Sequence, residues 1–141
     1  MSKSAIQSVE VVSQSARTHQ NPAVRVISKE TSLPYGNTVR QGDVMLTRHP
    51  LGTVFENVGP VTDNCQLAPG STAGSRHILR KGPTIYSRTG ATVLTGPVVE
   101  APNGFYLEHP RHGDMDCRLP GCYEVSYPRD LAAEGIARRA D

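Results

Sequence analysis

Two histidines, His109 and His112, lie three residues apart with Pro110 between them. On a straight strand the two imidazoles would point to opposite faces of a sheet. Pro110 and the following Gly113 predict a turn instead, because proline and glycine favour backbone angles found in turns. In a turn the two rings can converge on one point.

Two further residues complete a candidate metal site. His77 stands at the start of a predicted strand, and Cys117 follows His112 by five residues. Zinc accepts imidazole and thiolate ligands and needs about four of them in a tetrahedral arrangement. His77, His109, His112 and Cys117 are therefore candidate ligands for zinc or iron, in a metal-binding domain or a metalloenzyme. The alternatives are a polar loop with surface histidines, or a histidine pair bonded to a carboxylate or to the backbone.

The cysteines allow a second interpretation. Cys117 and Cys122 flank four residues and can face each other across a hairpin, as half of a metal site or as a redox pair. The sequence favours reduced cysteines that pack as small hydrophobic side chains. The chain contains no nucleophile elbow, phosphate-binding loop, zinc-protease helix motif or dinucleotide fingerprint. An enzyme is therefore not the expectation, and no cofactor is required apart from the metal of the alternative.

The elements that would position these residues are strands. Short β-prone pieces recur about every ten residues and are separated by glycine, proline and asparagine. This pattern predicts a mainly β protein, a small barrel or sandwich. Besides a strand entered through the turn at residues 42–43, the predicted strands are Val54–Val58, His77–Leu79, Thr84–Tyr86, Thr92–Leu94, Val98–Glu100, Phe105–Glu108 and Cys122–Tyr127.

The chain divides into three segments by texture. Residues 1–38 are polar and rich in serine and glutamine, which predicts an extended N-terminal arm. Residues 39–128 are expected to form the compact β-domain, and residues 129–141 a short C-terminal helix or tail. The arm carries two β-prone patches that can add strands to a partner's sheet, so they are candidate partner-binding residues. They are Val9, Val11 and Val12, and then Val24, Val26 and Ile27.

Composition and charge exclude several classes of protein. The net charge is +2 and the charges are scattered, so direct nucleic-acid binding is not expected. No stretch approaches the roughly 18 apolar residues of a membrane span, and the N-terminus has no apolar run of a signal peptide. With three cysteines and no disulfide framework, we expect synthesis in a reducing cytoplasm.

From Arg40 onward the sequence resembles a poorly characterised family of small proteins found in bacteria and their phages. Four short motifs and a charged tail carry the resemblance, and they are Arg40–Val44, Gly74–His77, Leu107–His112, Leu119–Val125 and Arg129–Asp141. The chain departs from the family pattern at Ser75, where the family has a further histidine. If the family pattern is a metal site, this chain lacks one of its ligands.

The resemblance implies an association with phages. Together with the arm, the modest core and the absence of catalytic motifs, it predicts a non-enzymatic structural protein of the virion. Such a protein would decorate or cement a capsid, with a capsid or other shell protein as its partner, and would self-associate into a homo-oligomer. A small metal-binding domain that uses the histidines is the alternative, and a host adaptor domain is a weaker one.

Overall fold

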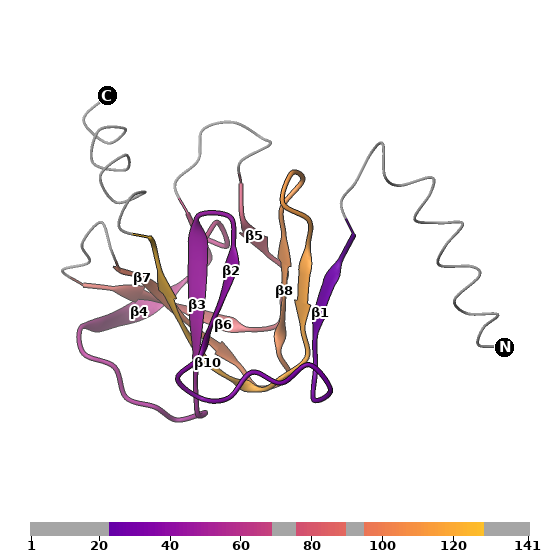
Figure 1. The fold of residues 1–141 in the computed structure, drawn as a ribbon. Helices are drawn as coiled ribbons and strands as arrows, with labels where there is room; N and C mark the ends of the chain where they lie inside the picture. Colours follow the sequence, from indigo (N-terminus) through magenta and orange to yellow (C-terminus); the bar gives the residue numbers. More distant parts are fainter. Residues whose placement is uncertain (1–22, 69–75, 90–94, 129–141) are drawn as a thin grey trace, which may run out of the picture.

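A computed structural model of the chain describes residues 23–68, 76–89 and 95–128. The described residues form ten strands and no helix, which confirms a mainly β protein (Figure 1). The strands are β1 (Arg25–Ile27), β2 (Thr38–Gln41), β3 (Val44–His49), β4 (Val58–Thr62), β5 (Ile78–Leu79), β6 (Thr84–Arg88), β7 (Thr95–Ala101), β8 (Phe105–Glu108), β9 (Met115–Cys117) and β10 (Gly121–Ser126). None of the described residues lies in a helix long and apolar enough to cross a membrane.

The strands form two sheets, and the segment around Gln66 pairs with the outer edge of β5 through an isolated bridge to Ile78. The larger sheet has the order β2-β3-β10-β7-β6-β4, and the smaller has the order β1-β9-β8-β5. Neighbouring strands are antiparallel, except that β1 runs parallel to β9. The two sheets are open rather than closed into one barrel, and their inner faces share one core.

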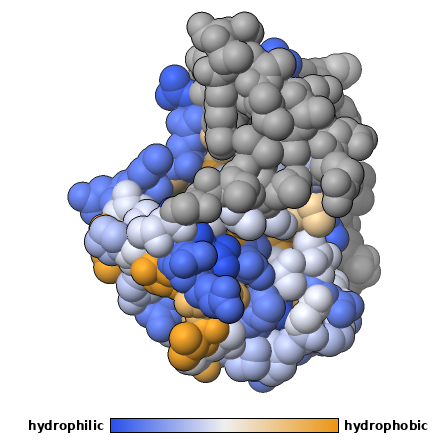
Figure 2. Space-filling model, turned by 90° about the vertical axis from the view of Figure 1, so that its left-hand side faces the viewer, coloured by the Kyte–Doolittle hydropathy of each residue, from blue (hydrophilic) through white to orange (hydrophobic). Residues whose placement is uncertain are grey.

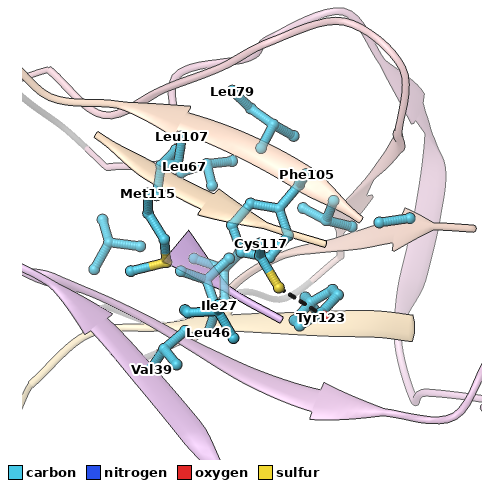
Figure 3. Close-up of a cluster of buried hydrophobic side chains, with 14 of the residues drawn as sticks. Ile27, Val39, Leu46, Leu67, Leu79, Phe105, Leu107, Met115, Cys117 and Tyr123 are labelled. Carbon is cyan, nitrogen blue, oxygen red and sulfur yellow. Dashed lines mark hydrogen bonds between the residues drawn. The ribbon is translucent and has the colours of Figure 1, made fainter. Parts of the chain in front are cut away.

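The core forms because alternate residues of the strands point inward. In β10, Tyr123 and Val125 are fully buried, while Glu124 between them is half-buried. Leu107 of β8 and Met115 of β9 come from the opposite sheet into the same cluster (Figure 3). Fully burying one such side chain contributes roughly 1.5–3 kcal/mol. This cluster therefore holds the two sheets together.

The C-terminal part of the expected arm belongs to the folded domain. β1 pairs with β9, and the side chain of Ile27 is 3% exposed within the core. Leu33 is also buried, so packing begins before residue 39. Ile27 therefore packs into the core of its own chain and not against a partner. Pairing within one chain avoids the entropy cost of binding a second molecule. Val24 and Val26 are 41% and 39% exposed and stay accessible to a partner.

Several expectations fall outside the described residues. They are the first β-prone patch (Val9, Val11 and Val12), the predicted strand Thr92–Leu94 and the C-terminal helix. Ser75, where the chain departs from the family pattern, also lies outside them.

Candidate histidine–carboxylate site

Three turns or strand ends meet at one edge of the molecule and bring the histidines together. His77 directly precedes β5, and His109 and His112 lie in the turn between β8 and β9. The ring centroids of His77 and His109 are 4.2 Å apart, and those of His109 and His112 are 4.5 Å apart. The predicted turn at Pro110 therefore places the imidazoles of His109 and His112 side by side, and the His109 ring lies between those of His112 and His77.

The β2–β3 turn supplies two polar residues to the same site. Gln41 pairs with Val44, so Gly42 and Asp43 form a two-residue turn between β2 and β3. Sequence reasoning noticed this Gly-Asp turn only as a strand entry. Gln41 and Asp43 are the residues of the site that it missed, because their partners lie 34 or more positions away along the chain.

Gln41 fixes the orientation and the tautomer of His77. Its Nε2 donates to the backbone carbonyls of Leu107 at 3.0 Å and Gly113 at 2.8 Å. Its Oε1 then faces His77 Nδ1 at 2.8 Å and can only accept a hydrogen bond. The Nδ1 atom of His77 therefore carries a proton.

Asp43 lies on the other side of the same ring. Its Oδ1 contacts Nε2 of His77, whose side chain is fully buried, while the Asp43 side chain is 26% exposed. Burial lowers the pKa of His77 to about 4, and the Asp43 carboxylate acts in the opposite direction. A neutral ring protonated at Nδ1 directs the lone pair of Nε2 at a carboxylate oxygen. That contact is favourable only when a positive species, a proton or a metal ion, lies between the two atoms.

His109 is engaged by the backbone of its own turn. Its Nδ1 accepts hydrogen bonds from the backbone N–H groups of Arg111 at 3.1 Å and His112 at 3.0 Å. Nε2 is thus the protonated nitrogen of the neutral ring. Burial lowers the pKa of His109, and the neighbouring His112 acts in the same direction. His109 therefore supports the site by packing and is a poor metal ligand.

His112 is exposed and rests on Gly42. Gly42 has φ +55°, and a Cβ atom built on it would lie 2.6 Å from Nε2 of His112. A side chain at position 42 would therefore displace the imidazole. Glycine serves both the left-handed turn and the close approach of the ring.

Cys117 does not join the histidines. It is buried in the core, and its Sγ contacts the Tyr123 hydroxyl at 3.2 Å (Figure 3). Cys117 and Cys122 are both free thiols. Of the four candidate ligands, the structure brings the three imidazoles together and places the thiol elsewhere.

The donor atoms do not form a ready-made metal site. Within residues 23–68, 76–89 and 95–128, no three or more histidine, cysteine, aspartate or glutamate side chains are arranged to hold a metal ion. Metal binding would require a rearrangement, and two of the side chains concerned, Asp43 and His112, are at least partly exposed.

Residues 40–127 match a family model described as a domain of unknown function, DUF8820. The matched segment contains the whole histidine–carboxylate site. No curated protein and no solved structure matches the chain.

Proposed function

We propose that the chain, which belongs to the DUF8820 family of domains of unknown function, binds a divalent transition-metal ion through His77, Asp43 and His112. Zinc and iron are the candidates, because imidazole and carboxylate ligands suit both. Three protein ligands would leave one position of the metal open to water or to another ligand.

The observation that carries the proposal is the hydrogen bond from His77 Nδ1 to Gln41 Oε1. Metal-binding histidines almost always donate their second N–H to a carbonyl or a carboxylate, which aims the other nitrogen at the metal. Gln41 is itself held by two backbone carbonyls, so the ring is fixed before any ion arrives. The Nε2 atom of His77 already faces Oδ1 of Asp43, which would be the second ligand.

His112 would complete the site by turning. Its ring lies nearly parallel to that of His77, with centroids 6.4 Å apart and an interplanar angle of 16°. Because His112 is exposed and Asp43 is half-buried, both can adjust while the buried His77 and Gln41 stay in place. A bound ion would tie the β2–β3 turn to the β8–β9 turn.

Native mass spectrometry of the full chain with stoichiometric zinc or iron(II) tests the proposal. We expect one ion per chain, and binding at least about tenfold weaker in Asp43→Asn and in His112→Asn. His49→Asn is the matched control. His49 also contacts a carboxylate, that of Glu124 at 3.3 Å, but it lies outside this site. Equal uptake by all four proteins would refute the proposal.

A structural role in a phage particle is the second candidate, and an exposed apolar surface favours it. Figure 2 faces the side on which β4 lies in Figure 1, and hydrophobic surface gathers in its lower part. Exposed aliphatic side chains between residues 51 and 61 are Leu51, Val54, Val58 and Val61; Val54 is 93% exposed, and Val54 and Val58 line one hollow. Monomeric proteins rarely expose large contiguous apolar patches. These side chains would pack against a shell protein or a second copy of the chain.

The contact would use side chains more than the edge of the sheet. β4 is an edge strand, but Pro60 lies within it and its pairing with β6 shifts register between Val58 and Val61. Both features hinder the addition of another strand. Sedimentation equilibrium of the wild type and of Val54→Ser/Val61→Ser tests this role. We expect self-association, or binding to purified phage shells, that the double variant weakens; a wild type that stays monomeric and binds no shell would refute it.

A further inference from the structure

A small hollow opens beside the histidines, between an edge strand of each sheet. β1 borders it on one side and β2 on the other, and the β8–β9 turn closes its end. Its volume is about 150 Å³, which is below the range of about 300–1,000 Å³ for drug-sized ligands. A free inorganic anion, or one charged end group of a larger molecule, is the size of ligand it suits.

Two arginines line this hollow and are held there by backbone carbonyls. Arg40 Nε donates to the carbonyl of Gly42 at 2.6 Å. Arg25 Nη1 donates to the carbonyl of Arg40 at 3.3 Å, and β1 is anchored by its pairing with β9. Each guanidinium has five N–H donors, so most of them stay free for a ligand.

The hollow carries an excess of positive charge, because two arginines and one carboxylate, Asp114, line it. Neither Arg25 nor Arg40 forms an ion pair within the described part of the chain. Asp114 is the carboxylate in the lining, and its two oxygens accept hydrogen bonds from the Tyr106 hydroxyl and the backbone N–H of His109. His112 adds an imidazole to the wall. Cationic groups gathered in a concave site attract anions.

We propose that this hollow binds a phosphate group, either free or at the end of a larger molecule, through Arg25, Arg40 and His112. Guanidinium groups bind phosphate oxygens with paired, charge-assisted hydrogen bonds. A phosphate monoester offers three acceptor oxygens to the two guanidinium groups and the imidazole, whereas a carboxylate offers only two.

This site goes beyond the metal site, although His112 belongs to both. The arginines carry the inference without any metal, so the two proposals can fail separately. The test is therefore made on the full chain in the presence of a chelator.

Calorimetric titration with inorganic phosphate at constant ionic strength measures the binding, with acetate and phenyl phosphate as parallel ligands. We expect saturable one-to-one binding of inorganic phosphate that is about tenfold or more weaker in Arg40→Gln and in Arg25→Gln. Arg118→Gln is the matched control, because Arg118 is an exposed arginine that pairs with Asp116 outside the hollow. Equal binding of phenyl phosphate would assign the site to an end group, and binding of the inorganic ion alone would assign it to free phosphate.

Three results would overturn the inference. They are phosphate binding that is unchanged in both arginine variants, binding that acetate matches, and binding that appears only after zinc is added. The last result would assign the anion to the metal and leave the metal proposal standing. Phosphate binding in a chain that takes up no metal would support the phosphate site and refute the metal proposal. Circular dichroism of each variant verifies that the overall β structure is retained.

Discussion

Gln41 and His77, 36 residues apart, form a buried hydrogen bond of 2.8 Å that decides which nitrogen of the imidazole carries its proton. Gln41 is 4% exposed and His77 is fully buried. Because Gln41 also donates to two backbone carbonyls, it joins the β2–β3 turn to the β8–β9 turn. The site is thus held by one side chain that makes three hydrogen bonds.

The first prediction concerns this side chain. Gln41→Met keeps the size and apolar stem of Gln41 but leaves the Leu107 and Gly113 carbonyls and the His77 Nδ1–H without their partner. Each buried group that loses its partner costs about 1–3 kcal/mol. Because the neighbouring side chains can adjust, we expect a total loss of about 2–4 kcal/mol in the free energy of unfolding by urea. A loss below about 0.5 kcal/mol would mean that the network does not hold the two turns together.

The second prediction concerns Gly42. Gly42→Ala places a non-glycine residue at φ +55° and pushes the imidazole of His112 away. Gly52→Ala is the matched control, because Gly52 has φ +86° and nothing within 4 Å of its added Cβ atom. We expect Gly42→Ala to lower the free energy of unfolding by about 1 kcal/mol more than the control does. Combining Gly42→Ala with His112→Ala should remove this excess, and an unchanged excess would contradict the role of the ring.

The extent to which the sequence predicts this site follows from the distances along the chain. The approach of His109 and His112 depends on Pro110 and Gly113, so local turn chemistry predicts it. The partners Gln41 and Asp43 lie at the β2–β3 turn of the larger sheet, whereas the three histidines adjoin strands of the smaller sheet. Only the packing of the two sheets brings these residues together. Local sequence patterns carry no information on that packing.

The same limit applies to the strands. Phe105–Glu108 is predicted with its observed bounds, because its apolar and polar residues alternate. The strand predicted at Val54–Val58 lies instead at Val58–Thr62, although Gly59 and Pro60 disfavour a strand there. An edge position tolerates them, because one side of the strand needs no partner. β9 has only three residues, Met115–Cys117, too few for a pattern to be recognised.

The third prediction concerns pH and applies to the metal-free protein in a chelator. Burial lowers the pKa of His77 to about 4 and also lowers that of His109, whereas an unfolded histidine has a pKa near 6.5. Below pH 6.5 the unfolded chain binds protons that the folded chain does not, so stability is full above this pH and falls toward pH 4. We expect the free energy of unfolding to fall by about 1–3 kcal/mol across this window.

Two variants serve as controls for the pH dependence. His77→Gln/His109→Gln should flatten the profile between pH 6.5 and pH 4, whereas His49→Asn should leave its slope unchanged. Stability that rises on acidification would show the contrary, that His77 is protonated against Asp43 in the folded state.

The fourth prediction concerns the core. The Tyr123 hydroxyl donates to the Leu119 carbonyl at 2.5 Å and contacts Cys117 Sγ at 3.2 Å, and burial raises its pKa. Tyr123→Phe leaves a buried carbonyl without its donor, so we expect a loss of about 1–2 kcal/mol in the free energy of unfolding. Tyr35→Phe is the matched control, because Tyr35 is 56% exposed. Equal effects of the two substitutions would count against this hydrogen bond.

The most direct test of the metal proposal is a competition titration of zinc into the full chain and into Gln41→Met, Asp43→Asn and His49→Asn. We predict one zinc ion per wild-type chain and per His49→Asn chain. Binding to Gln41→Met should be weaker by about 10- to 100-fold, because Gln41 orients a ligand without touching the ion. Binding to Asp43→Asn should be weaker still, because this variant removes a ligand. Zinc binding that is absent from the wild type, or equal in all four proteins, would contradict a metal site at His77 and Asp43.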